Sequence, residues 1–151
     1  MQPLKNILVI GGAGFIGSHM CAFLAQQGVN VVVLDNLSSG HKDAVLQARF
    51  VYGDLADRLI LDRVFSELEF DAVMHFASSI LVGESVQEPA KYYQNNLTNT
   101  LNLLNAMRVH GVKQFIFSST AAIFGEPQSE RIDETHLQPR QRHRLFGAAG
   151  D

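Results

Sequence analysis

An apolar run followed at once by three spaced glycines constrains the fold of this chain more than any other stretch. Residues 7–10 read Ile-Leu-Val-Ile, a continuous apolar run typical of a strand that is buried on both faces. Gly11, Gly14 and Gly17 follow, and this spacing predicts a tight turn that leads into a helix. Glycine allows the turn, the close approach of an anion to the backbone, and the close packing of the helix on the sheet. The stretch therefore predicts an anion site at a helix N-terminus.

A second apolar run, residues 29–34, ends at Asp35. An acid about 20 residues beyond such a glycine loop is where a dinucleotide-binding fold holds the adenosine ribose by its hydroxyls. A carboxylate at this position would repel a 2′-phosphate, so the sequence favours NAD over NADP. The alternative interpretation is a solvated acid at the end of a strand. The polar turn that follows, Asn36 to Gly40, could line the adenosine pocket.

The rest of the chain continues the alternation of strands and helices. We expect strands at residues 49–52, 71–76 and 112–119, and helices that end at Gly28 or cover residues 59–68 and 89–111. The apolar residues predicted to form the buried helix faces are Ile16, Met20, Phe23 and Leu24, then Leu61, Val64, Phe65 and Leu68, then Tyr93, Leu97, Leu101 and Leu104. Short connections between repeated strand and helix units predict an α/β fold with a Rossmann-like, doubly wound parallel sheet.

Several polar residues admit both a structural and a functional interpretation. Cys21 lacks a base or metal partner at useful spacing, so we interpret it as a packing residue. His75 is isolated within a predicted strand, which favours a core histidine. Asn95 and Asn96 are poor helix formers in mid-helix, so at least one should contact a partner, the alternative being a solvated face. The small residues after the fourth strand, Ala77 to Ser79, leave room for a ligand at the carboxyl end of the sheet.

Composition excludes several classes of protein. The net charge is -3, which provides no electrostatic basis for binding nucleic acid or an anionic membrane. No apolar run approaches the roughly 18 residues of a membrane span, and the first strand begins too early for a signal peptide. Cys21 is the only cysteine, which excludes an internal disulfide and fits a reducing compartment. We therefore expect a cytoplasmic protein, and no metal site.

The motifs together resemble the N-terminal part of the extended short-chain dehydrogenase/reductase family, and within it the UDP-glucose 4-epimerases. The motifs that carry this resemblance are residues 11–19 (Gly-Gly-Ala-Gly-Phe-Ile-Gly-Ser-His), 35–41 (Asp-Asn-Leu-Ser-Ser-Gly-His), 53–55 (Gly-Asp-Leu), 75–77 (His-Phe-Ala), 81–86 (Leu-Val-Gly-Glu-Ser-Val), 92–96 (Tyr-Tyr-Gln-Asn-Asn) and 117–125 (Phe-Ser-Ser-Thr-Ala-Ala-Ile-Phe-Gly). It implies a homodimeric enzyme that interconverts UDP-glucose and UDP-galactose through a 4-keto sugar, with tightly held NAD.

The resemblance also implies roles for individual residues. The pyrophosphate would lie against Gly11, Gly14, Phe15 and Ile16, the adenosine ribose against Asp35 and Asn36 with Ser38, Ser39 and Gly40 nearby, the adenine against Asp54 and Leu55, and the nicotinamide side against Phe76, Ala77, Ser78, Asn95 and Ser118. Thr120 matches the Ser/Thr that binds the 4-hydroxyl of the sugar. Ala121 and Ala122 stand where related 4,6-dehydratases carry Asp-Glu, which disfavours a dehydratase. Other nucleotide-sugar epimerases stay open.

The sequence departs from the family pattern towards its end. The family's proton carrier is a Tyr-x-x-x-Lys pair after the fifth strand, but the last tyrosine is Tyr93 and the last lysine is Lys113. We therefore expect negligible epimerisation by this chain alone, and a non-catalytic NAD-binding module or relic is the alternative function. We expect an NAD-binding domain over residues 1–139, incomplete at its C-terminal end, and a disordered Arg-rich tail outside the family pattern over 140–151. We prefer an out-of-frame end to a nucleic-acid-binding arm for this tail.

Overall fold

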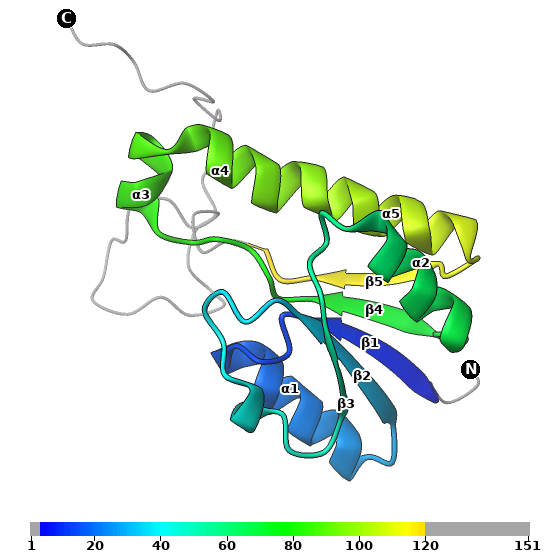
Figure 1. Ribbon diagram of the computed structural model, residues 1–151. Coiled ribbons are helices and arrows are strands. Elements are labelled where there is room, and N and C mark those ends of the chain that lie inside the picture. Colours follow the sequence, from blue (N-terminus) through cyan, green and yellow to red (C-terminus); the bar gives the residue numbers. More distant parts are fainter. Residues whose placement is uncertain (1–3, 120–151) are drawn as a thin grey trace, which may run out of the picture. The chain divides into compact units, whose positions relative to one another are not determined.

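The computed structural model describes residues 4–119, which contain a five-stranded, fully parallel sheet (Figure 1). The spatial order of the strands is β3-β2-β1-β4-β5. Their bounds are β1 Asn6–Ile10, β2 Asn30–Asp35, β3 Arg49–Tyr52, β4 Ala72–His75 and β5 Gln114–Phe117. The order changes direction between β1 and β4, and such a switch point is where open α/β sheets bind ligands at the carboxyl ends of their strands. The predicted Rossmann-like, doubly wound sheet is confirmed.

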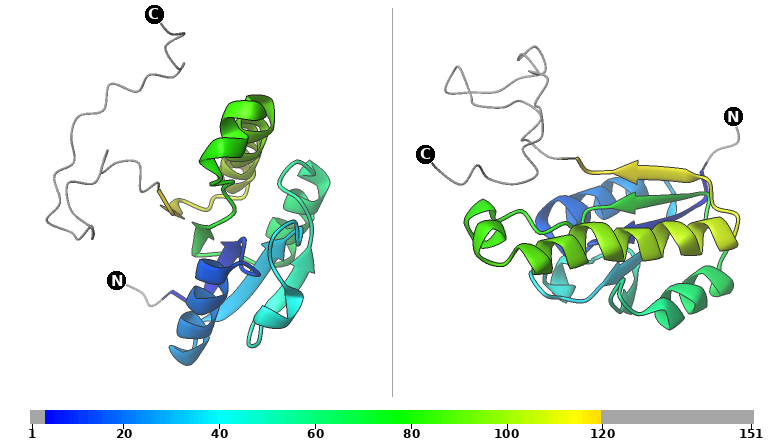
Figure 2. Two further views of the ribbon diagram at one scale, coloured as in Figure 1. Left: turned by 90° about the vertical axis from the view of Figure 1, so that its left-hand side faces the viewer. Right: turned by 90° about the horizontal axis from the view of Figure 1, so that it is seen from above.

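Helices cover both faces of this sheet. Helix α1 (Phe15–Gln26) lies on one face, and α2 (Arg58–Glu67) lies on the other beside the long helical segment that precedes β5 (Figure 2). That segment is continuous but changes type along its length, as α4 (Pro89–Tyr93), a π-helical turn η2 (Gln94–Thr98) and α5 (Asn99–Val109). None of the helices in the described part of the chain has the length and hydropathy of a bilayer-spanning segment.

The central strands are buried on both faces, as the apolar runs predict. Leu8 and Ile10 pack with Leu61 of α2 and Leu103 of α5. The alternate residues of β1 pack on the opposite face, together with Cys21 of α1. Because successive strand residues point to opposite faces, one short strand contributes to two cores. The predicted packing role of Cys21 is confirmed, since its side chain is 3% exposed.

The predicted buried face of one helix is confirmed and those of two others are wrong. In α2 the buried residues are Leu61, Val64 and Phe65. In α1 they are Gly17, Cys21 and Leu24. Ile16 and Phe23, which we expected inside, are exposed. The reason is steric, because the helix must lie close to the glycine loop, and the smallest residues therefore face the sheet.

The long helical segment is rotated by about half a turn from our expectation. Its buried residues are Asn99, Leu103 and Met107. The residues predicted to be buried, which are Tyr93, Leu97, Leu101 and Leu104, are all exposed by more than a third of their area. The predicted stripe assumed one uninterrupted α-helix, but the π-helical turn inserts an extra residue and changes the phase.

Two further helical elements have no counterpart in the sequence-based prediction. They are α3 (Val82–Gln87) and the 3-10 turn η1 (Lys42–Ala44). Glu84 of α3 pairs with Lys91 and accepts a hydrogen bond from Tyr92 at 2.7 Å, which ties α3 to α4. These donors lower the pKa of the Glu84 carboxyl. Each element has six residues or fewer, too few for a periodic apolar pattern to be recognised.

Candidate dinucleotide-binding site

The glycine loop lies at the carboxyl end of β1 and is closely packed. Gly11 has φ +76°, and a Cβ at this position would lie 2.8 Å from the carbonyl carbon of Phe76. A Cβ at Gly17 would overlap the carbonyl oxygen of Gly11. At Gly14, by contrast, an added Cβ would meet only that same oxygen, at 3.4 Å. The first and third glycines thus permit the fold, whereas the second leaves an open approach to the backbone.

Helix α1 begins directly at this open approach. Gly14 is its N-cap, and the first bond of the helix runs from the Ser18 amide to the Gly14 carbonyl. Within residues 4–119 the amides of Phe15, Ile16 and Gly17 therefore donate to no other protein group. Free amides and the positive end of the helix dipole together favour an anion here. The Phe15 and Ile16 side chains are 82% and 58% exposed beside it.

Asp35 is buried at the end of β2 and holds the glycine loop. One carboxylate oxygen accepts from the Ala13 amide at 3.0 Å, and the other from the Leu37 amide at 2.8 Å. Its exposure of 9% excludes the alternative of a solvated strand-end acid. Each oxygen retains acceptor capacity for a ligand hydroxyl. Leu37, with φ 57°, is a left-handed non-glycine residue, a strained conformation that clusters at functional sites and that sequence reasoning missed.

The predicted adenosine turn packs directly against the glycine loop. A Cβ at Gly40 would lie 2.6 Å from the Ala13 carbonyl carbon. The next amide, that of His41, donates to the Ala13 oxygen at 3.0 Å. Ser38 and Ser39 are exposed on the same turn. The predicted pyrophosphate and adenosine residues are therefore adjacent in space.

The loop after β3 lies next to this turn through one side-chain contact. The Asn36 amide donates to one carboxylate oxygen of Asp54 at 2.6 Å, and the other oxygen accepts from the Ala56 amide at 2.8 Å. Leu55 is buried at 7% exposure, and within the described residues its amide donates to no protein group. The loop thus presents a fixed carboxylate beside a free N–H group, the pair of groups that an adenine edge can use.

On the other side of β1, the loop after β4 is held by two asparagines of the π-helical turn. The Asn95 amide donates to the Ala77 carbonyl at 3.1 Å and to the Ser79 hydroxyl at 3.2 Å. Asn96 makes a reciprocal pair of bonds with the Ser79 backbone, at 2.8 and 2.9 Å. The expectation that one of the two asparagines contacts a partner is confirmed for both. The turn brings two consecutive side chains to one loop.

Ser78, in the middle of that loop, has a buried hydroxyl with no partner among the described residues. A buried hydroxyl without a bond is costly, so this atom marks a place where a ligand group could bind. Ser118, predicted for the same region, follows β5, and its amide donates to the His75 carbonyl at 3.1 Å. Thr120, the candidate catalytic residue, lies outside the described residues.

The two titratable residues that we interpreted as structural are both buried. His75 is 1% exposed, and burial lowers the pKa of its imidazole. Its ring packs against Phe115 and Phe117, and its Nε2 lies 3.4 Å from the Thr100 hydroxyl. Burial raises the pKa of the Cys21 thiol to about 11. This thiol is protonated at neutral pH and therefore a poor nucleophile.

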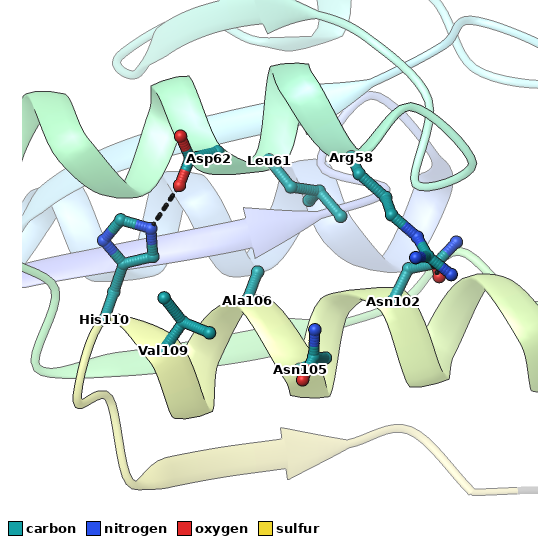
Figure 3. A pocket seen from close by; sticks show the side chains of 8 residues that line it. All are labelled: Arg58, Leu61, Asp62, Asn102, Asn105, Ala106, Val109 and His110. Carbon is teal, nitrogen blue, oxygen red and sulfur yellow. Dashed lines mark hydrogen bonds and ion pairs between the residues drawn. The ribbon is translucent and has the colours of Figure 1, made fainter.

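A pocket between α2 and α5 lies away from these loops and is too small for a dinucleotide (Figure 3). Its volume is about 110 Å³, whereas pockets for drug-sized ligands occupy roughly 300–1,000 Å³. His110 donates or accepts at 2.8 Å from Asp62 at one end, and Arg58 meets Asn102 at the other. We interpret it as a packing groove between two helices.

Comparison with known proteins agrees with this geometry. The family model described as "NAD dependent epimerase/dehydratase family" matches residues 7–149. A UDP-glucose 4-epimerase from Halalkalibacterium halodurans is 50% identical over 129 residues, which are 85% of this chain and 39% of that protein. A probable UDP-arabinose 4-epimerase from Oryza sativa is 46% identical over 145 residues, 89% of this chain and 36% of that protein.

Solved structures extend the similarity to three dimensions. UDP-glucose 4-epimerase from Brucella ovis, in complex with NAD, superposes with a TM-score of 0.79 at 48% identity, over 89% of this chain and 41% of that one. The enzyme from Bifidobacterium longum, in complex with NAD+ and UDP, gives 0.78 at 38% identity, over 89% and 42%. The chain thus spans about 40% of the length of these relatives. It belongs to the NAD-dependent epimerase/dehydratase family.

Proposed function

We propose that this chain is the NAD-binding part of a UDP-glucose 4-epimerase. One observation carries the proposal: the loops after β1, β2, β3 and β4 meet at the carboxyl edge of the sheet, each with the groups that a dinucleotide needs. The free amides of α1 suit a pyrophosphate, and the buried Asp35 carboxylate suits ribose hydroxyls. The Asp54 carboxylate and the Leu55 amide suit an adenine edge.

The residues present fit NAD as judged by the site itself. The approach to Gly14 is open, so a phosphate can reach the helix amides without moving the backbone. The partnerless Ser78 hydroxyl lies at the end of β4, on the other side of β1 from Asp54. Bound NAD would supply hydride acceptance and donation, and these residues would bind and orient it.

The substrate and cellular setting of the relatives form the second part of the proposal. The UDP-glucose 4-epimerase relatives support a UDP-hexose as substrate, a place in galactose metabolism, and a homodimer in the cytoplasm. UDP-arabinose 4-epimerases match almost as well, so a pentose substrate is the alternative within the same chemistry. We further propose that Thr120 binds the sugar 4-hydroxyl, and that the NAD-binding domain covers residues 1–139.

A second candidate is an NAD-binding module without catalysis. The observation that favours it is the absence from this sequence of a tyrosine with a lysine four residues later. Without this pair no side chain of the expected kind can move the proton of the 4-hydroxyl. Conversion of UDP-galactose by the purified chain would exclude this candidate.

The binding of NAD is tested by calorimetric titration with NAD and NADP. We expect NAD to bind at least about tenfold more tightly than NADP, because Asp35 repels a 2′-phosphate. Asp35→Asn should narrow that preference, since it removes the charge. Asp43→Asn, which changes an exposed acid of η1, is the matched control and should leave the preference intact. Equal affinities in the parent chain would contradict the proposed site.

A further inference from the structure

Asn102 of α5 reaches across to the loop after β3, although it belongs to the helix that holds the opposite side of the site. Its Nδ2 donates to the Leu55 carbonyl at 3.1 Å. Its Oδ1 accepts from the Arg58 guanidinium at 3.1 Å. Only one orientation of the amide satisfies both bonds. Figure 3 shows the Arg58 and Asn102 side chains meeting at one end of the groove between α2 and α5.

The bond to Leu55 fixes a peptide plane on which Asp54 depends. The peptide between Leu55 and Ala56 is held at its oxygen by Asn102 and at its N–H by the Asp54 carboxylate, at 2.8 Å. The second carboxylate oxygen is held by Asn36. Asp54 is therefore oriented from two directions, and one of them originates in α5 through Asn102.

We propose that Asn102 is a positioning residue for recognition of the adenine ring. It acts through the Leu55–Ala56 peptide, which directs the Asp54 carboxylate towards the adenine amino group. The inference rests on the proposed NAD site and deepens it, because it names what selects adenine among purines. It also gives one helical segment two tasks, since Asn95 and Asn96 hold the loop after β4 and Asn102 holds the loop after β3.

The test uses two ligands that differ at the adenine amino group, NAD and nicotinamide hypoxanthine dinucleotide. Asn102→Asp is the informative variant, because it keeps the size and the acceptor for Arg58 but replaces the donor to Leu55 with a repelling oxygen. We expect the ratio of the two dissociation constants to fall about fivefold in this variant, the effect of one hydrogen bond. A merely structural role would weaken both ligands equally and leave the ratio unchanged.

Two more variants keep the test decisive. Asn105→Asp alters the same groove but loses only a bond to Arg108 on its own helix, so the ratio should stay at the parent value. Arg58→Ala removes an exposed side chain and frees the Asn102 amide to rotate, so the ratio should fall partway even if Asn102→Asp does not fold. An unchanged ratio in both Arg58→Ala and Asn102→Asp would overturn the inference alone. Failure of the parent chain to bind either ligand would overturn the proposed NAD site and the inference with it.

Discussion

The two sides of the sheet differ in how completely their residues are covered. On the β1–β2 side, every residue from Val31 to Asp35 is buried, and the loops that follow are tied to one another. On the β5 side, Ile116 and Phe117 are 48% and 45% exposed. The comparison teaches that the adenosine-facing side of the site has a complete core within the described residues, whereas the other side keeps apolar surface accessible.

The physical origin of the difference lies in the position of the strands. Strand β1 pairs with β2 and β4, but β5 pairs only with β4 among the described strands. Helix α1 covers the face that contains Val9 and Val33, and Ile116 lies farther along the same face. The predicted exposure of a large apolar surface near the long helix is confirmed, with Leu97 and Leu101 more than half exposed.

The largest effect expected from this comparison is the loss of a core side chain from β1. Leu8→Ala should lower the free energy of unfolding by about 3 kcal/mol or more, because Leu8 is fully buried in close packing. Leu101→Ala, the same change at an exposed position, should cost no more than about 0.5 kcal/mol. Urea unfolding of both variants provides the measurement. Similar losses in the two would contradict the contrast between the sides.

A somewhat smaller effect is expected when a methyl group is added to the glycine loop. Gly17→Ala should cost about 2 kcal/mol, because the new Cβ overlaps the Gly11 carbonyl and α1 must move away. Gly83→Ala is the control, since nothing lies within 4 Å of a Cβ built there. Replacing this helical glycine should stabilise the protein by about 0.5 kcal/mol. Thermal unfolding of both variants would reveal any departure from these opposite signs.

The pH dependence of stability probes the boundary between the two sides, where His75 is buried. Burial lowers the pKa of its imidazole below the ordinary value of 6.5, so the unfolded state binds more protons in this range. Stability should therefore be fully present above pH 6.5 and fall as the pH is lowered below it. Asp71 and Glu84 also have lowered pKa values, but they act only at more acidic pH.

Denaturant unfolding at several pH values between about 5 and 8 measures this slope. His75→Gln, which cannot be protonated in this range, should flatten it whatever the absolute stability of the variant. His19→Gln, at an exposed position, should retain the slope of the parent chain. A slope that survives His75→Gln would show that another group carries the pH dependence.

The smallest effect on stability, but a clear one on association, is expected at the exposed apolar side. The double variant Leu97→Lys and Leu101→Lys should leave the unfolding temperature within about 2 °C of the parent, because both side chains are more than half exposed. It should also reduce self-association in sedimentation experiments, since large exposed apolar patches promote it. A marked loss of stability would instead mean that these residues are covered in solution.

The sequence predicts the adenosine side of the site well and the other side less completely. The strand and glycine pattern around Gly11, and the acid at Asp35, follow from local spacing, so the order of residues along the chain is enough to place both. The orientation of Leu101 does not follow in this way, because a π-helical turn at Gln94–Thr98 changes the phase of the helix, and no apolar period reveals such an insertion.

Contacts between distant segments were likewise beyond sequence reasoning. Asn102 and Leu55 are 47 positions apart, and an asparagine on a helix surface carries no pattern that identifies its partner. The strain at Leu37 is similar, because a leucine gives no signal for a left-handed backbone. Two loops that meet only after the sheet has formed hold the residues that the prediction missed.

The most direct test of the account is thermal unfolding of the parent chain and of Gly14→Ala, each with and without NAD. A ligand that binds only the folded state must raise its stability, by about 2.7 kcal/mol at one hundred times the dissociation constant. We predict a clear upward shift for the parent chain. Gly14→Ala should unfold near the same temperature without ligand and lose most of the shift, because its methyl group fills the open approach to the helix amides. No shift in the parent chain, or an equal shift in the variant, would contradict the assignment of this loop as a dinucleotide site.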